Sequence, residues 1–104
     1  MKSFKLEIRV YDNNTRRWQV FLERISDDHM LRNWVSPNDG KDYFSKTWTG
    51  MQMPGDILDV YVACSGYGGS VRCVVLINDA KPGVNNTIIA NFDDGAAAKK
   101  TFHI

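Results

Sequence analysis

The sequence predicts an all-β fold, an antiparallel immunoglobulin-like β-sandwich of roughly seven or eight strands. Apolar residues recur at every second position over most of the chain, which is the period of a half-buried strand. Asn, Asp, Gly and Pro residues separate these stretches at intervals of roughly 8–12 residues, a spacing typical of sandwiches and barrels. The sequence contains no long amphipathic helical stretch and no internal repeat, so neither a helical bundle nor a repeat array fits it.

The N-terminal part of the chain is predicted to form a β-hairpin over residues 4–24. Apolar and charged residues alternate from Phe4 to Val10, and the alternation resumes from Trp18 to Leu22. Between these two stretches, residues 12–15 read Asp-Asn-Asn-Thr, and their short polar side chains bond locally and tolerate left-handed backbone.

The middle of the chain, residues 26–55, shows no sustained period of two or of 3.6 residues. We expect a short helical turn at residues 27–31 and a strong turn at residues 36–40, which read Ser-Pro-Asn-Asp-Gly. A short strand is expected from Tyr43 to Trp48.

The second half is predicted to begin with another hairpin, over residues 57–77, whose two apolar strands flank the stretch CSGYGGS at residues 64–70. A phosphate cradle would need a helix directly after the glycines, but a β-branched strand follows, so the stretch is predicted to be a turn. Turn residues then run from Asn78 to Asn86, a β-branched strand from Thr87 to Phe92, and a last strand is expected at residues 100–104.

The two cysteines, Cys64 and Cys73, fall opposite each other in this predicted hairpin when Gly68 and Gly69 form its two-residue turn. Two alternatives are open: a cross-strand disulfide, or a pair of buried free thiols that behave as small hydrophobes. We prefer the free thiols because no secretion signal is visible.

Alternate positions of the predicted strands define the expected core, because every second side chain of a strand points to the same face. The expected core residues are Phe4, Leu6, Ile8, Trp18, Val20, Val60, Val62, Val71, Cys73, Val75, Ile77 and Ile89 or its neighbours.

Composition indicates one globular domain over residues 1–104, with 43% hydrophobic and 24% charged residues. The formal net charge is +1, so the chain lacks the global field that draws a protein to nucleic acid, and a nucleic-acid partner is not expected. The start, MKSFKLEIRV, has no apolar core of a signal peptide, and a cytoplasmic location is the default expectation. No stretch is apolar and long enough for a membrane span.

Catalysis finds no support in the sequence, and we expect a protein that is not an enzyme. The two histidines, His29 and His103, stand alone, without the spacing of a catalytic or zinc-binding motif. No cofactor is expected, apart from the calcium considered below.

The first functional hypothesis is a non-catalytic module that binds another protein through a sheet edge or an aromatic loop surface. The expected partner-binding residues are Trp34, Tyr43, Trp48 and Tyr67. Aromatic residues are enriched at interface cores, and the irregular middle segment does not commit them to a regular core face. In the competing interpretation, this segment packs irregularly across an open end of the sandwich.

The second hypothesis is a small-ligand module that binds calcium or carbohydrate through acidic and aromatic loops. Calcium takes 6–8 oxygen ligands, and acidic residues gather at the predicted strand ends. The candidate metal ligands are Asp27, Asp28, Asp39, Asp42, Asp93 and Asp94. Asn and Asp are also what turns use, so the same residues fit ordinary turns.

Residues 46–79 resemble the extracytoplasmic β-sandwich of MmpS-type small membrane proteins, which are accessories of lipid transporters. The shared features are the Trp-bearing strand Lys46-Thr47-Trp48-Thr49, the apolar strand from Asp59 to Cys64, a small-residue turn, and the strand from Val71 to Asp79. The resemblance implies a sandwich fold. The sequence differs from that family in having no N-terminal membrane helix and no cysteine near its C-terminus, so the transport role is not carried over.

Overall fold

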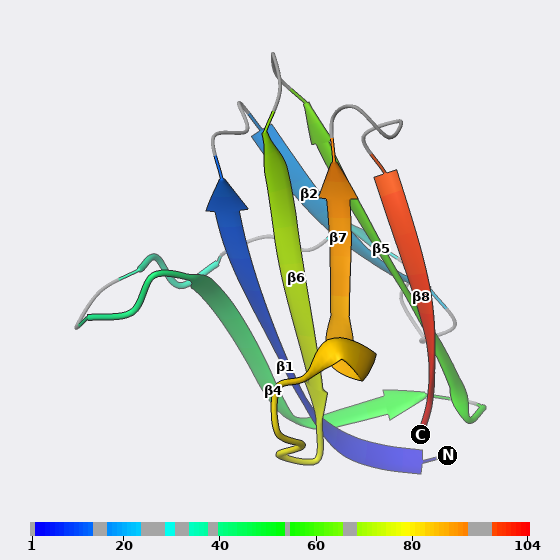
Figure 1. Cartoon of the computed structure of the whole chain (residues 1–104). Helices are drawn as coiled ribbons and strands as arrows, with labels where there is room; N and C mark the ends of the chain where they lie inside the picture. Colours follow the sequence, from blue (N-terminus) through cyan, green and yellow to red (C-terminus); the bar gives the residue numbers. More distant parts are fainter. Residues whose placement is uncertain are drawn as a thin grey trace.

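The computed structural model forms two layers of β-sheet (Figure 1). It describes residues 2–13, 17–23, 29–30, 34–37, 40–53, 55–65, 69–91 and 97–104. The strands are β1 (Lys2–Asn13), β2 (Arg17–Glu23), β3 (His29–Met30), β4 (Phe44–Met53), β5 (Ile57–Ser65), β6 (Ser70–Ile77), β7 (Thr87–Asn91) and β8 (Ala97–His103). A short 3-10 helix, η1 (Val84–Asn86), precedes β7.

The strands form two four-stranded antiparallel sheets. Sheet A has the order β4-β1-β6-β7, and sheet B has the order β3-β2-β5-β8. The prediction of an all-β, antiparallel architecture is therefore confirmed. Within the part of the chain that the structure describes, no helix is long and apolar enough to cross a membrane.

Both predicted hairpins are wrong. β1 lies in sheet A beside β4 and β6, whereas β2 lies in sheet B. The two strands of the second predicted hairpin, residues 57–77, also belong to different sheets, because β5 lies in sheet B and β6 lies in sheet A. Each of these connections crosses from one layer to the other. A period of two reports which face of a strand is buried, and it is identical for two strands that pair and two strands that face each other across the core.

The irregular middle segment also differs from the prediction. The expected helical turn at residues 27–31 is wrong at its two described positions, His29 and Met30, which form β3 beside β2. The short strand expected from Tyr43 becomes the ten-residue β4. Two residues of β4, Thr49 and Gly50, lie opposite the single Lys5 of β1, and the strand bends there.

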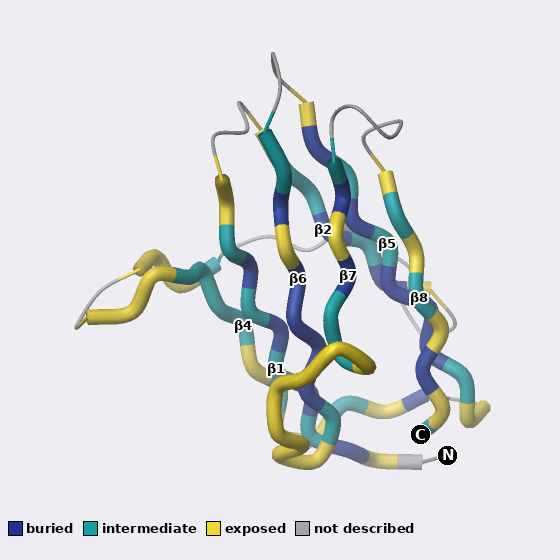
Figure 2. Tube along the Cα trace, in the orientation of Figure 1, coloured by how far each residue is buried: buried dark blue, intermediate teal, exposed yellow. Residues whose placement is uncertain are grey.

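The core fills the space between the two sheets, and burial alternates along most strands (Figure 2). Nine of the predicted core residues are buried, namely Phe4, Leu6, Ile8, Val20, Val60, Val62, Val71, Cys73 and Val75. Trp18 and Ile77 are only partly buried at the margin. Ile89 is 58% exposed, and its neighbours Ile88 and Ala90 are the buried residues of β7. The core also takes in residues that the prediction left out: Val10, Leu22, Met53, Leu58, Cys64 and Phe102.

The two cysteines are buried and free, which agrees with the preferred alternative. Their predicted position opposite each other is wrong, because they lie in different sheets. Cys64 is opposite Trp18 in sheet B, and Cys73 lies between Val10 and Ile88 in sheet A. Burial raises the pKa of the Cys73 thiol to about 12. Burial, followed by the negative charge of Asp12, raises the pKa of Cys64.

Candidate binding face on sheet B

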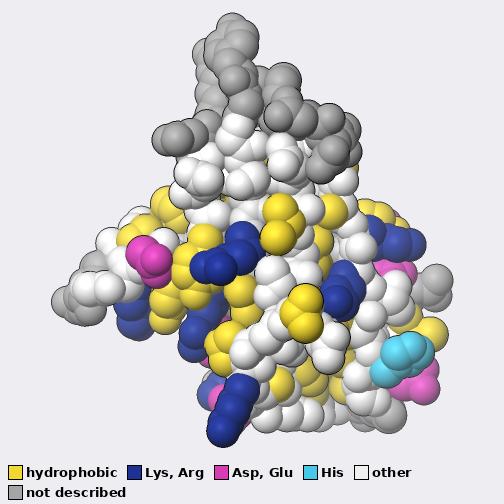
Figure 3. Space-filling model, in the orientation of Figure 1, with side chains coloured by type: hydrophobic (Ala, Val, Ile, Leu, Met, Phe, Trp, Pro, Cys, Tyr) yellow, Lys and Arg dark blue, Asp and Glu magenta, His cyan; other side chains and the backbone are white. Residues whose placement is uncertain are grey.

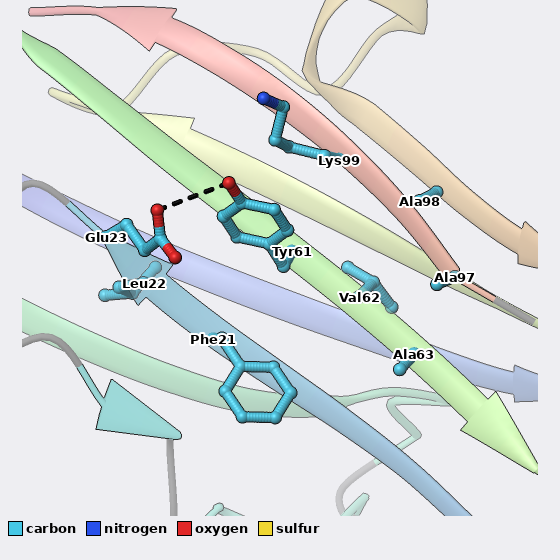
Figure 4. A pocket seen from close by; sticks show the side chains of 9 residues that line it. All are labelled: Phe21, Leu22, Glu23, Tyr61, Val62, Ala63, Ala97, Ala98 and Lys99. Carbon is cyan, nitrogen blue, oxygen red and sulfur yellow. Dashed lines mark hydrogen bonds between the residues drawn. The ribbon is translucent and has the colours of Figure 1, made fainter.

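The outer face of sheet B contains a shallow hollow of about 640 Å³ (Figure 4). This volume lies within the range of small-molecule sites, roughly 300–1,000 Å³. The residues that line it come from three adjacent strands, β2, β5 and β8. They are Phe21, Leu22, Glu23, Tyr61, Val62, Ala63, Ala97, Ala98 and Lys99.

The register of the three strands explains why the hollow forms. Phe21, Tyr61 and Lys99 occupy one row across the sheet, because Phe21 pairs with Tyr61 and Tyr61 pairs with Lys99. In the next row, Ala63 pairs with Ala97. Cross-strand partners point to the same face, so two large rings stand beside two methyl groups. The alanines form the floor of the hollow and the rings form its wall.

Two charged side chains border the rings on opposite sides. The hydroxyl of Tyr61 donates a hydrogen bond of 3.2 Å to Glu23 Oε2 on the β2 side. On the β8 side, Lys99 Nζ lies 5.5 Å from the centroid of the Tyr61 ring, in cation–π geometry. Neither Glu23 nor Lys99 forms an ion pair with any residue that the structure describes. The hollow therefore combines an apolar centre with one exposed charge of each sign in its lining.

The outer face of sheet A is organised differently (Figure 3). Lys5 Nζ lies 2.6 Å from Asp79 Oδ1, and Arg9 Nε lies 2.6 Å from Glu7 Oε2. The side-chain hydrogen bond and the charge of each carboxylate raise the pKa values of Lys5 and Arg9. The Arg72 guanidinium lies 4.2 Å from the centroid of the Tyr11 ring. The charges of this face are thus matched within the protein itself.

Three of the four predicted partner-binding residues are described, and Tyr43 lies apart from Trp34 and Trp48. Trp34 contacts Trp18 edge-on, with 5.1 Å between ring centroids, and packs with Trp48 against the margin of the core. Tyr43 instead contacts Tyr11, with 5.3 Å between centroids, on the outer face of sheet A. Tyr67 lies outside the described residues. The first three are partly buried, so each contributes packing as well as surface.

The predicted calcium ligands fall mostly outside the described residues, where Asp27, Asp28, Asp39, Asp93 and Asp94 all lie. Asp42 is described, is exposed, and borders a second hollow of about 410 Å³ near Tyr11 and Arg72 on sheet A. The described residues contain no group of three or more His, Cys, Asp or Glu side chains that would hold a metal ion. Calcium binding by the acidic loops stays a prediction.

Sequence reasoning missed the face on sheet B, although a signal for it was present. Phe21 and Tyr61 occupy the outward phase of two apolar strands, between the core residues Val20 and Leu22 and between Val60 and Val62. An aromatic side chain that points away from the core exposes a large apolar area, unless neighbouring side chains or another molecule cover it. The sequence alone does not show that these two strands are neighbours.

Comparison of this chain with family models, with curated proteins and with solved structures gives no match.

Proposed function

We propose that this protein is a non-catalytic interaction module that binds another protein through the outer face of sheet B. The observation that carries the proposal is the hollow itself, in which Phe21 and Tyr61 stand beside Ala63 and Ala97. Interfaces place aromatic residues at an apolar centre and polar residues at the rim. Glu23 and Lys99 supply such a rim.

We further propose that the sandwich is immunoglobulin-like in its central strands. In an immunoglobulin domain, the second strand lies beside the fifth in one sheet, and the third lies beside the sixth in the other. β1 beside β4 and β2 beside β5 repeat this arrangement, with β1–β2 and β4–β5 connections that cross between the sheets. β6 and β7 depart from it, because they extend sheet A on the side of β1 where the first immunoglobulin strand would lie. This likeness supports the fold proposal and assigns no partner.

The β4 edge of sheet A is a weaker candidate than the face. At the β4 edge of sheet A, the Val35 amide donates to the Ser45 carbonyl at 2.9 Å, and the Ser45 amide donates to the Val35 carbonyl at 3.0 Å. The remainder of β4 carries Lys46 and the bulge at Thr49 and Gly50. A charged residue and a bulge are devices that discourage pairing with an additional strand. The docking surface is accordingly assigned to the face of sheet B.

Carbohydrate binding is a second candidate function, which the exposed rings favour. The C–H groups of a sugar ring stack against the electron-rich face of an aromatic ring, and Phe21 and Tyr61 border one hollow. Glu23 would accept, and Lys99 would donate, hydrogen bonds from and to sugar hydroxyl groups. Calcium binding by the acidic loops remains an alternative that only the sequence supports.

A matched pair of variants tests the face. Ala63→Arg fills the hollow on sheet B, whereas Ile89→Arg places the same side chain at an exposed apolar position on sheet A. Tagged wild-type protein and Ile89→Arg are expected to retain the same protein partner from an extract, and Ala63→Arg is expected to lose it. Retention by Ala63→Arg, or loss with Ile89→Arg alone, would contradict the assignment.

The carbohydrate alternative is separated by thermal denaturation with a panel of sugars, with calcium and with a chelator. A ligand that binds only the folded state raises the midpoint of unfolding, by an amount that grows with its concentration. A sugar that raises the midpoint of the wild type but not of Ala63→Arg would replace the protein-binding proposal with the carbohydrate one. A calcium-dependent rise would instead point to the acidic loops.

A further inference from the structure

We infer that the partner of the sheet B face is a second copy of this chain. The inference rests on the proposed function, because it assigns an occupant to the same face. It is argued from the positions of the two charges and from the shapes of the residues between them.

Glu23 and Lys99 lie on opposite sides of the central strand of the face (Figure 4). Glu23 is on β2, Lys99 is on β8, and β5 runs between these strands and carries Tyr61. A two-fold axis along β5, in the plane between two facing copies, reverses the strand order across the interface. The β2 side of each copy then faces the β8 side of the other.

This symmetry brings Glu23 of each copy toward Lys99 of the other, so a single geometry creates two opposite-charge contacts. Along β5, Glu23 is level with Asp59 and Lys99 is level with Tyr61. The offset is two residues, about 7 Å, which two long side chains span. The other in-plane axis, perpendicular to β5, would set β2 of each copy against β2 of the second copy and β8 against β8, so no contact between Glu23 and Lys99 would form.

The apolar surface is also self-complementary under the same axis. Phe21 lies on the β2 side of the hollow and the small Ala97 lies on the β8 side, one row further along β5. The rotation places the ring of each copy opposite Lys99 of the other, one row from its alanine floor, and the carbon stem of a lysine can cover a ring. Tyr61 lies on β5 itself, close to the axis, so the two tyrosine rings meet each other. The same apolar patch of both copies thus meets itself, as an isologous interface requires.

The charges of sheet A support the choice of sheet B. Lys5 and Arg9 already have carboxylate partners at 2.6 Å within the same molecule, whereas Glu23 and Lys99 form no ion pair with a described residue and contact Tyr61 instead. A second copy supplies a partner to both unpaired charges at once.

Charge reversal tests the inference on the full chain by sedimentation equilibrium across a wide concentration range. The wild type is expected to self-associate to a dimer, and Glu23→Lys and Lys99→Glu should each raise the dimer dissociation constant about tenfold or more, because like charges then face each other. The double variant, Glu23→Lys with Lys99→Glu, exchanges the two charges and should return the constant to within about threefold of the wild type. Lys41→Glu, which makes the same charge change at an exposed position near Tyr43, should leave it unchanged.

A wild-type protein that stays monomeric at every concentration overturns the inference, and so does a double variant no better than the single ones. Circular dichroism of each variant establishes that it is folded. If the monomer captures a different protein and Ala63→Arg abolishes that capture, the second-copy inference fails and the proposed function stands. If neither self-association nor capture depends on Ala63, both fail.

Discussion

On the outer face of sheet A, Val74 and Leu76 are 5% and 3% exposed, whereas on the outer face of sheet B, Phe21 and Tyr61 remain partly open beside alanines. The strand partners account for the difference. Val74 pairs with Arg9, and Leu76 pairs with Glu7, whose side chains are long and joined to each other. The carbon stems of such residues cover apolar neighbours while their charged ends reach water.

The comparison shows two ways in which a sandwich treats apolar residues that point away from its core. Sheet A covers Val74 and Leu76 with its own ion-paired side chains, although Ile89 on β7 stays exposed. Sheet B flanks Phe21 and Tyr61 with alanine, so the two rings remain partly open at a hollow. The same contrast predicts how variants of the two faces will differ in stability.

The largest difference is expected between Leu76→Ala on sheet A and Phe21→Ala on sheet B. Leu76→Ala should lower the free energy of unfolding by about 2–4 kcal/mol, because it empties a buried site. Phe21→Ala removes a larger side chain but should cost only about 1–2 kcal/mol, since part of the ring already contacts water. Urea unfolding of both variants measures this, and a larger loss for Phe21→Ala would show that sheet B has no open face.

A variant of Trp34 tests how much the packing at the core margin stabilises the fold, because this ring contacts Trp18 there. Trp34→Ala should lower the free energy of unfolding by about 2 kcal/mol, less than a fully buried tryptophan, because the ring is only partly buried and loses one aromatic contact. A denaturant melt decides the matter. A loss below about 0.5 kcal/mol, the level of an ordinary surface residue, would return Trp34 to the set of free partner-binding residues.

The two thiols on the inner faces of the sheets make stability depend on pH. Unfolded thiols ionise near pH 8.5, whereas the pKa of folded Cys73 is about 12, so between these values the unfolded state binds fewer protons than the folded state. The contribution of Cys73 to the free energy of unfolding should therefore be complete below pH 8.5. Above pH 8.5 the free energy of unfolding should fall by about 1.4 kcal/mol per pH unit because of Cys73. Urea melts at several pH values between 7 and 11 would measure the slope.

Cys73→Ala is the control for this pH dependence. It should remove the contribution of Cys73 while leaving that of Cys64, whose pKa is also raised. Equal slopes for Cys73→Ala and the wild type above pH 9 would contradict a buried, protonated thiol.

The smallest effect concerns the carboxylates of the two faces. Glu7→Gln should lower the free energy of unfolding by about 0.5–1 kcal/mol at low salt, because Glu7 pairs with Arg9 at 2.6 Å in a partly buried site. Glu23→Gln should cost less than about 0.5 kcal/mol in the monomer, since its hydrogen bond with Tyr61 is exposed. The Glu7 effect should shrink in 1 M salt, and a salt-independent loss would indicate that packing, not charge, is responsible.

Much of the fold was predictable because the period of two in the sequence reports burial directly. Phe4, Leu6 and Ile8 are in the core for this reason, and the turn after β6 follows from local chemistry. Asn78 and Asp79 adopt φ values of 53° and 60°, a left-handed conformation that short Asx side chains tolerate.

The candidate site was less predictable, because its residues come from three strands that are distant in sequence. The aromatic phase of Phe21 and of Tyr61 was visible in the sequence, but the pairing that joins them, and that of Ala63 with Ala97, was not. The sequence also did not show that Trp34 and Trp48 pack against the core margin, whereas Tyr43 contacts Tyr11 on the outer face of sheet A.

By itself, the sequence determined most of the strands, their buried faces and the turn at Asn78 and Asp79, since these depend on residues close together in the chain. Only the tertiary structure decided that β1 and β6 share one sheet while β2 and β5 share the other. Strand pairing depends on contacts between distant segments, and a pattern with a period of two is compatible with many such pairings. The neighbour of each outward side chain is set at the same step, which is why Leu76 is covered and Tyr61 is left open.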